Sequence, residues 1–342
     1  MISMKEIAKR CNVSVATVSK AMNGYTDIGE ATRTLILRTA AEAGYLPNSS
    51  ARALKTKRTY NLGVIFVDEG NSGLTHEYFN RVLDSFKNTA EERGYDITFA
   101  SKKIAAQRMS YYEHCRFRGV DGVVMACVDF NTEEAQELVN SELPVVTIDH
   151  VFDGRISVVS NNVHGMETLV SYIVEKGHSK IAYIHGENTS VTKSRLTGFH
   201  RTLQAVGIRV PDEYIRTGSY RDPDLAAALT GELLDLADPP TCIMYSDDYA
   251  AMGGINEIRE RGLRIPDDIS VVGYDGINIA QIMEPKLTTL CQDTGAIGRI
   301  AAEKLIELIE NPRTTLVDKF TVEGTLYKGA SVRQIHKQAF IA

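Results

Sequence analysis

Residues 3–23 read SMKEIAKRCNVSVATVSKAMN, and this stretch decides how the chain begins to fold. Ser3 can cap a helix, and Glu6 stands three positions later, which completes the pattern of a capping box. The helical period breaks at Asn12, and Ser14 can cap a second helix with its own apolar stripe. Two short helices joined by a turn of about four residues form a helix-turn-helix, which places its second helix in a DNA major groove. The alternative is that both are pieces of a larger helical bundle.

Charge is distributed unevenly along the chain. Residues 1–60 hold ten Lys and Arg against four Asp and Glu, whereas the remaining residues hold 28 against 40. A small basic head on an acidic body predicts that the head alone meets a polyanion. The alternative is a basic surface that only keeps the head soluble.

Length and composition bound the class of protein. A chain of 342 residues with 43% apolar residues is expected to form two or three domains with substantial cores. No stretch has the length and apolarity of a membrane span, and the N-terminus has no signal-peptide core, so we expect a cytoplasmic protein. The five cysteines are scattered without metal-ligand spacing, which is typical of reduced thiols.

Enzyme signatures are absent from the sequence. It contains no GxxxxGK[ST], GxSxG or HExxH motif, and no GxGxxG follows the first strand. Asp247 and Asp275 could in principle form an acid/base pair, but their spacing carries no further catalytic signal. We therefore expect no enzyme, no cofactor and no metal site.

Three segments follow the helix-turn-helix in order. A third helix is predicted over about 30–43, and a very short one over 49–55, which is too short to hold a helical conformation alone in water. Polar residues 56–59 read as a linker. We therefore expect a DNA-binding headpiece over 1–46, a hinge helix and linker over 47–59, and an effector-binding and dimerisation core over 60–342.

Strands and helices alternate through the core, which predicts parallel sheets covered on both faces. Two successive sets of elements indicate two similar α/β subdomains. Strands are predicted over 62–67, 97–100, 122–126, 145–148, 181–185, 215–219, 241–245 and 270–273, with further strands around 316–328. Helices are predicted over 75–92, 105–117, 131–141, 164–176, 195–206, 223–237, 249–261 and 296–310.

Motifs spread over nearly the whole chain resemble the lactose-repressor (LacI/GalR-type) family of transcriptional regulators. They are VSVATVSK over 13–20 followed by Asn23, GYLPN over 44–48, ARAL over 51–54, ISVVGYD over 269–275 and LTTL over 287–290. The resemblance implies a core like that of periplasmic binding proteins, crossed by the chain near 160, 291 and 321. Its N-subdomain would cover about 60–160 and 292–321, and its C-subdomain about 161–291 and 322–342.

The same resemblance implies which residues meet DNA. They are Ser14, Val15, Ala16, Thr17, Ser19, Lys20 and Asn23 in the headpiece, with Leu54 and Lys55 in the hinge. Val15 and Ala16 would offer apolar contacts to bases, whereas Lys20 could reach a guanine edge or a phosphate. Leu54 would be a wedge in the minor groove between paired hinge helices. The alternatives are that Val15 belongs to the core and that Leu54 is an ordinary linker residue.

The resemblance also implies a ligand site in the cleft between the subdomains. Its candidate residues are Arg195, Tyr220, Asp247 and Asp275, with His76, Asp149 and Gln292 as weaker candidates. Asp247 and Asp275 follow buried strands at their carboxyl ends, where open α/β sheets bind ligands. Asp248 is interpreted as the cap of the next helix. Carboxylates, an arginine and an aromatic ring suit a carbohydrate, and Tyr220 favours a sugar over a purine.

The sequence therefore predicts a transcriptional repressor of carbohydrate-use genes. It would bind double-stranded operator DNA as a homodimer, because the tail over 330–342 is too short and irregular for a tetramerising leucine heptad. A small ligand, a sugar or sugar phosphate, would control it. Two alternatives stay open: a solute-binding protein of a sugar transporter, and a regulator controlled mainly by a phosphocarrier protein. The effector, its direction of action and the operator are not encoded in any motif.

Overall fold

The computed structural model describes residues 2–22, 24–45, 53, 56–67, 73–104 and 107–335. The chain divides into two compact units, Met1–Thr59 and Tyr60–Ala342. Each unit has its own hydrophobic core, and each is described by itself. Several sequence predictions fall outside the described residues: the hinge helix over 49–55 except Ala53, the tail beyond 335, and Asn23, Leu54 and Lys55.

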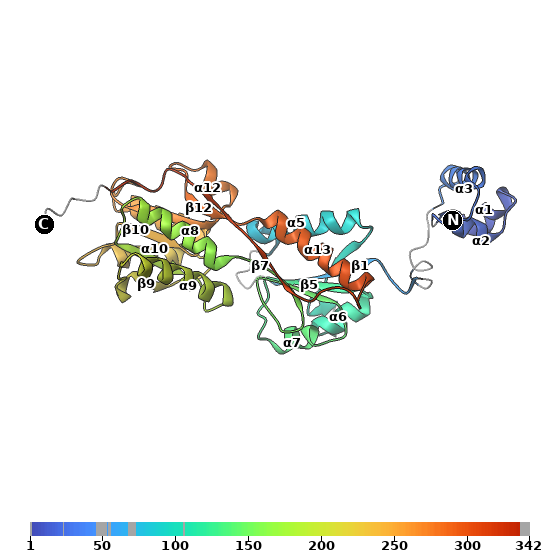
Figure 1. Cartoon of the computed structure of the whole chain (residues 1–342), viewed down its shortest axis with the longest axis horizontal. Helices are drawn as coiled ribbons and strands as arrows, with labels where there is room; N and C mark the ends of the chain where they lie inside the picture. The colour runs from blue at the N-terminus through green and yellow to red at the C-terminus, as the bar shows by residue number, and fades with distance from the viewer. Residues whose placement is uncertain are drawn as a thin grey trace. The chain divides into compact units, whose positions relative to one another are not determined.

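Three helices form the headpiece, as the sequence predicts (Figure 1). They are α1 (Met4–Arg10), α2 (Val15–Met22) and α3 (Glu30–Glu42). The Ser3 side chain caps α1 by accepting from the Glu6 N–H, and the Ser14 hydroxyl accepts from the Thr17 N–H at 3.0 Å at the start of α2. A small cluster of buried side chains joins the helices: Ile7, Ala8, Cys11, Val18, Ala21, Ile36 and Ala40.

The second unit begins with a subdomain that we call the N-lobe. Its sheet has the order β13-β7-β6-β5-β1-β2, with all pairings parallel. The strands are β1 (Asn61–Phe66), β2 (Asp96–Phe99), β5 (Gly122–Ala126), β6 (Val145–Ile148), β7 (Ile156–Ser160) and β13 (Lys319–Val322). The helices are α5 (Glu77–Glu92), α6 (Tyr111–Arg118), α7 (Glu133–Val139) and α13 (Thr294–Glu310), after the short turn η1 (Gly73–Thr75). Apolar clusters on both faces of the sheet explain its nearly continuous apolar strands.

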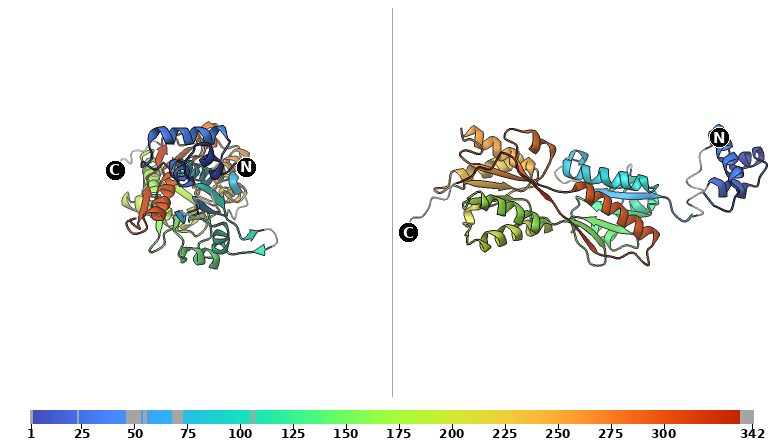
Figure 2. Two further views of the ribbon diagram at one scale, coloured as in Figure 1. Left: turned by 90° about the vertical axis from the view of Figure 1, so that its right-hand side faces the viewer. Right: turned by 45° about the horizontal axis from the view of Figure 1, so that its top comes forward.

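The C-lobe repeats this architecture of a sheet covered by helices (Figure 2). Its sheet has the order β14-β12-β11-β10-β8-β9. Its strands are β8 (Ile181–His185), β9 (Ile215–Thr217), β10 (Cys242–Tyr245), β11 (Ser270–Asp275), β12 (Thr288–Cys291) and β14 (Thr325–Tyr327), of which β14 is antiparallel to β12. Its helices are α8 (Asn162–Glu175), α9 (Ser190–Ala205), α10 (Pro223–Leu234), α11 (Asp248–Glu260) and α12 (Asn278–Ile282), with the turn η2 (Asp212–Tyr214). The predicted fold class, a helical headpiece followed by two parallel-sheet subdomains, is confirmed.

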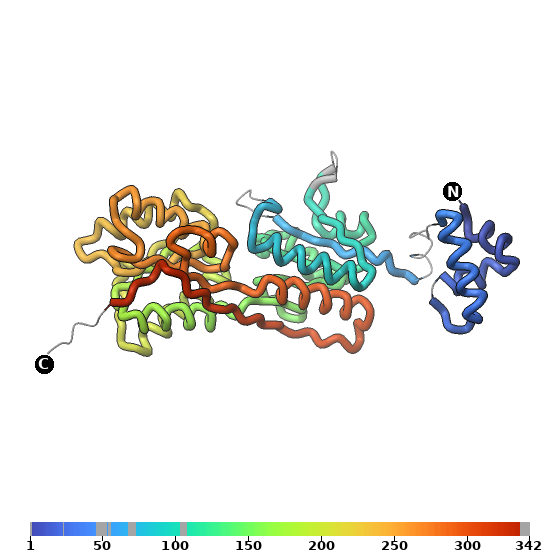
Figure 3. Tube along the Cα trace, turned by 90° about the horizontal axis from the view of Figure 1, so that it is seen from above, coloured from blue at the N-terminus to red at the C-terminus, as the bar shows by residue number. Residues whose placement is uncertain are grey.

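The chain passes between the lobes at three places (Figure 3). It leaves the N-lobe sheet after Ser160, returns after Cys291, and crosses again between Val322 and Thr325. Because all three passages lie side by side, residues distant in sequence meet at the junction. Asn161, for example, donates from its side chain to Glu323 at 2.7 Å.

Local capping explains two differences from the predicted helices. The helix predicted over 105–117 begins at Tyr111, because Ser110 and Glu113 form a capping box, and the short strands β3 (Lys103–Ile104) and β4 (Gln107–Arg108) precede it. The helix predicted from 195 begins five residues earlier, because Thr189 caps it. The sequence interpretation missed β7, β12 and α12, whose short segments lack a clear period.

Within the described ranges no helix is long and apolar enough to cross a membrane. The described residues also contain no group of three or more His, Cys, Asp or Glu that could hold a metal ion. All five cysteines are free thiols.

Candidate functional site

Helix α2 exposes the face that the sequence assigns to DNA. Val18 and Ala21 are buried against the other headpiece helices, whereas Val15 is 41% exposed. The alternative interpretation of Val15 as a core residue is therefore wrong. Ser14, Ala16 and Lys20 are also exposed, and Thr17 and Ser19 are half-buried.

Lys20 has a partner that the sequence interpretation missed. Its ammonium forms an ion pair with Asp27, and both side chains are about half exposed. The hydrogen bond from Lys20 lowers the pKa of Asp27, so Asp27 stays ionised at neutral pH. A carboxylate beside the exposed face of α2 repels phosphates, and here it holds the Lys20 ammonium in an ion pair. Asp27 is one of four acidic residues in a basic head, which was an available signal.

The candidate ligand residues of the C-lobe meet at one edge of its sheet. Tyr220 follows β9, Asp247 follows β10 and Asp275 ends β11, so the carboxyl ends of these parallel strands place them together. Arg195 reaches this edge from the second turn of α9 and is only 3% exposed. The sequence named all four residues, and the sheet explains why they are neighbours.

Neighbouring groups hold the Arg195 guanidinium in place. Its Nε donates to Asn162 Oδ1 at 2.8 Å, and its Nη1 donates to the Ser246 carbonyl at 2.7 Å. Nη2 lies 3.7 Å from Asp275 Oδ1, and the ring of Tyr274 lies 3.5 Å from the guanidinium carbon. A planar cation stacked on a ring and bonded at two nitrogens is a rigid feature of the site.

Asp275 links Arg195 to the N-lobe. Its Oδ1 accepts from Gln292 Nε2 at 2.7 Å, and Gln292 accepts in turn from the hydroxyl of Ser160, the last residue of β7. The backbone of Asp275 has φ 102°, a strained conformation for a residue with a side chain. Burial raises the pKa of Asp275 to about 6, against the attraction of Arg195. The weaker candidate Gln292 therefore stands directly between the lobes.

Asp149 approaches the same place from the N-lobe. Its Oδ2 accepts from the Tyr78 hydroxyl at 2.9 Å, and its carbonyl accepts from Ser190 of the C-lobe at 3.3 Å. Its Oδ1 is covered from solvent and has no hydrogen-bond partner among the described residues. Burial raises the pKa of Asp149. His76, the other weak candidate, lies at the start of α5, where Phe79 meets its ring edge-on at 4.9 Å.

Tyr220 presents a ring that is fixed by its surroundings. It packs against Gly186, where an added Cβ would lie 2.3 Å from the ring. Its hydroxyl is hydrogen-bonded to Thr192 at 2.8 Å, and the Arg195 guanidinium lies 5.8 Å from the ring centroid. Only glycine at 186 permits this close approach.

The structure corrects the roles assigned to two neighbouring carboxylates. Asp247, not Asp248, caps α11: its Oδ1 accepts from the Ala250 N–H at 2.9 Å, and its Oδ2 accepts from the Arg221 N–H at 2.8 Å. Asp248 instead accepts from the Thr289 hydroxyl at 2.7 Å and the Ile277 N–H at 2.9 Å. The helix starts one residue earlier than predicted, so Asp248 turns inward and braces the loop after Asp275.

The sequence interpretation did not name several contributing residues. They are Tyr78, Ser160, Asn162, Ser246 and Tyr274. Signals were available for Ser246, a polar residue directly after β10, and for Tyr274, which lies in the ISVVGYD motif. Nothing local marks Tyr78, because its partner Asp149 is 71 positions away.

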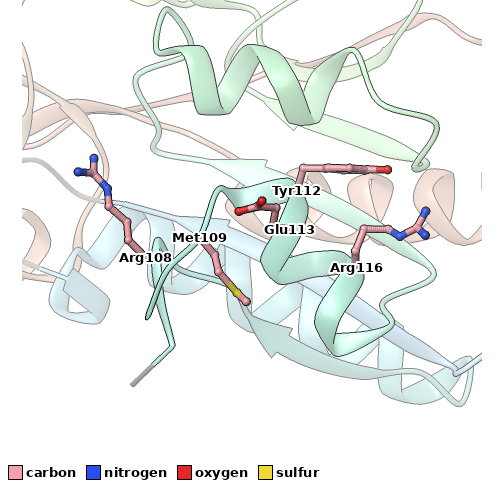
Figure 4. Close-up of a pocket in the computed structure, with 5 residues that line it drawn as sticks. All are labelled: Arg108, Met109, Tyr112, Glu113 and Arg116. Carbon is pink, nitrogen blue, oxygen red and sulfur yellow. The ribbon is translucent and has the colours of Figure 1, made fainter. Parts of the chain in front are cut away.

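Two surface pockets lie away from this group. One, of about 590 Å³, lies over α6 and is drawn in Figure 4. It is lined by Arg108, Met109, Tyr112, Glu113 and Arg116. The other, of about 490 Å³, lies along α8 and includes Tyr172 and Lys328. Neither pocket includes Arg195 or Asp275.

Both units match models of known protein families. A model of bacterial regulatory proteins of the lacI family matches residues 3–48, and a model of a periplasmic binding protein-like domain matches residues 170–332. The probable HTH-type transcriptional repressor ExuR of Bacillus subtilis (strain 168) is 31% identical over 318 residues, covering 92% of this chain and 93% of the relative. The HTH-type transcriptional repressor PurR of Vibrio vulnificus is 29% identical over 320 residues, covering 91% and 93%.

Solved structures agree with these matches. A complex of the transcriptional regulator CelR with cellobiose has a TM-score of 0.70 at 25% identity and covers 97% of this chain and 100% of its own. The lac repressor dimer bound to operator and the anti-inducer ONPF has a TM-score of 0.78 at 24% identity and covers 97% and 99%. The resemblance found in the sequence is confirmed, and the chain belongs to the lacI family of bacterial regulatory proteins.

Proposed function

We propose that this regulator represses transcription as a homodimer on a pseudo-palindromic operator and that a saccharide bound between the lobes controls it. One observation carries the proposal. The chain combines an exposed recognition helix with a separate unit in which Arg195, Asp275 and two tyrosine rings form a rigid polar group at the sheet edge. We propose three functional segments: a headpiece over 1–46, a hinge over 47–59 and a core over 60–342.

DNA recognition is proposed for the exposed face of α2. Val15 and Ala16 offer apolar contact to bases, Lys20 supplies a cation, and Ser14, Thr17, Ser19 and Asn23 hold phosphates and the fold. Leu54 and Lys55 of the hinge are proposed to reach the minor groove between base steps. In the proposed homodimer, two headpieces would read the two half-sites of one duplex.

Effector recognition is proposed for the group around Arg195. Asp149, Asp275 and Gln292 supply polar contacts, and Tyr220 supplies a ring for the apolar face of a sugar. The cellobiose bound by CelR supports a saccharide. Asp247 and His76 are proposed as peripheral contacts, because both oxygens of Asp247 already accept from the chain.

Contacts between the lobes suggest how an effector would be sensed. Glu77 of α5 accepts from the Asn278 N–H at 2.8 Å, and Arg81 donates to the Asn278 side chain. Asn278 stands three residues after Asp275. A ligand that moves Asp275 would therefore change contacts that hold the lobes together.

Two other functions are less well supported. A solute-binding protein of a transporter shares the two-lobed fold but has no use for the headpiece. A regulator controlled by a phosphocarrier protein would share the fold and the DNA-binding role. Action on chromosomal DNA places the proposed protein in the cytoplasm.

The test begins with an operator selected from random duplexes by the full-length protein. Its affinity is then measured by fluorescence anisotropy at fixed salt, with and without a panel of saccharides and purines. We expect specific binding that one saccharide changes at least severalfold. Absence of any selected sequence, or control by a purine instead, would reject the corresponding half of the proposal.

A further inference from the structure

In the group around Arg195, one buried oxygen of Asp149 has no hydrogen-bond partner among the described residues, whereas the nitrogens of Arg195 and Gln292 face acceptors of the chain. We propose that this site takes an uncharged, hydroxyl-rich saccharide and discriminates against the carboxylated or phosphorylated form of the same sugar, with Asp149 and Asp275 as the discriminating residues. This inference rests on the proposed function, because it names the class of saccharide that the interlobe site takes.

The unused acceptor is on Asp149. Its Oδ1 is covered from solvent and accepts no hydrogen bond within the described part of the chain, while Oδ2 is held by Tyr78. A buried acceptor without a partner is costly, and a ligand that donates to it recovers that cost. A sugar hydroxyl can donate, whereas a carboxylate or a phosphate dianion cannot.

The donors of Arg195 and Gln292 already face acceptors of the chain. Arg195 uses Nε for Asn162 and Nη1 for Ser246, and its Nη2 faces Asp275. The Gln292 amide donates to Asp275 at 2.7 Å. An anionic ligand could use these donors only by breaking their contacts with Asn162, Ser246 and Asp275.

The charges lead to the same conclusion. Asp149 follows a strand of the N-lobe and Asp275 ends a strand of the C-lobe, where Arg195 Nη2 lies 3.7 Å from Asp275 Oδ1. Burial raises the pKa of each carboxyl, against the attraction of Arg195. Another negative charge at this place would repel both carboxylates, whereas an uncharged ligand would not.

Arg221 is the group that could reverse this preference. Its Nε and Nη1 are covered and have no hydrogen-bond partner among the described residues. However, its guanidinium lies over the Tyr249 ring at 4.5 Å, and the contact with Asp247 comes from the Arg221 backbone N–H. Arg221 therefore enters the test as a separate variant.

The test is calorimetric titration of the full-length protein with matched pairs at one pH and salt concentration. The pairs are ribose and ribose 5-phosphate, galactose and galacturonate, and cellobiose and cellobionate. We expect at least one neutral sugar to bind, and its anionic partner to bind roughly tenfold or more weakly, because like charges in contact are strongly unfavourable. Asp149→Asn should reduce the ratio of the neutral sugar's affinity to that of its anionic partner. Asp212→Asn, on the exposed turn η2, should leave this ratio unchanged.

Each outcome decides the inference. If an anionic partner binds as tightly as its neutral sugar, the inference is overturned while saccharide control stands, and loss of that binding in Arg221→Ala would identify the cause. If no member of any pair binds, both this inference and the saccharide part of the proposed function fail, and operator binding is unaffected. The ratio in the unmodified protein decides the matter even if Asp149→Asn does not fold.

Discussion

In the headpiece, four side chains proposed to meet DNA are exposed, those of Ser14, Val15, Ala16 and Lys20, whereas in the core Arg195 and its partners are buried between strands and helices. Val15 is largely exposed and Lys20 pairs with Asp27 on the surface. Arg195 is 3% exposed and contacts groups from several elements. The headpiece presents a surface to a large partner, and the core encloses a small one.

The two regions also differ in what holds them together. The headpiece core consists of a few small and medium side chains, and its buried Cys11 and Ala21 contribute little area. The core unit has apolar clusters on both faces of both sheets. Substitution of a proposed DNA-binding residue should therefore change only DNA affinity. Substitution of a residue in the Arg195 group should change both ligand affinity and the stability of the core.

The largest effect should come from separating the two regions. Deleting residues 1–58 should abolish duplex binding and leave a folded core that binds the same saccharide, because the units have separate cores. Fluorescence anisotropy and calorimetry on the truncated protein measure both. Operator affinity in the truncated protein would show that the core itself binds DNA.

Arg195→Ala should be the most damaging single change in the core. It removes the cation that Asp275 faces and leaves the Asn162 side chain and the Ser246 carbonyl without their donor. Breaking a buried pair of this kind costs roughly 3–5 kcal/mol of the free energy of unfolding. Urea unfolding followed by circular dichroism measures the loss, and Arg209→Ala, at an exposed position, is the control. A loss below about 1 kcal/mol, the range of surface pairs, would contradict the assignment.

Asp275 should make stability depend on pH. Its pKa is raised from 3.8 to about 6 in the folded state, so the folded protein holds this proton more tightly than the unfolded chain. The stabilising contribution is complete below the unfolded pKa and is lost as pH rises through about 6. Since the shift corresponds to roughly 3 kcal/mol, Asp275→Asn should gain up to that much stability relative to the unmodified protein between about pH 4 and pH 7. A constant difference across this range would show that Asp275 is not protonated near pH 6.

The smallest effect should come from the headpiece surface. Asp27→Asn removes a carboxylate beside α2 and frees Lys20, so DNA affinity should rise severalfold on operator and random duplex alike. The dependence of log affinity on log salt should steepen by about one phosphate contact. The control is Glu42→Gln, at an exposed position of α3. Unfolding should barely change, because an exposed ion pair contributes little. Weaker binding would mean that Asp27 positions Lys20 for the duplex.

Much of the fold was predictable because its signals are local. Ser3 and Ser14 cap helices through bonds that span three residues, and the alternation of apolar strands with helices marks both parallel sheets. Arg195, Tyr220 and Asp275 were named by the family resemblance, and Asp275 also by its place at the end of a buried strand.

Other features were decided by the tertiary structure. Whether Asp247 or Asp248 caps α11 depends on Thr289 and Ile277, which lie about thirty to forty positions away and give Asp248 another partner. The meeting of Asp149 with the Arg195 group depends on two lobes joined at three passages. Sequence alone determines contacts made within a turn or a strand, since those follow from local geometry. The sheet order brings distant residues together, and only then do burial and missing partners define the chemistry of the site.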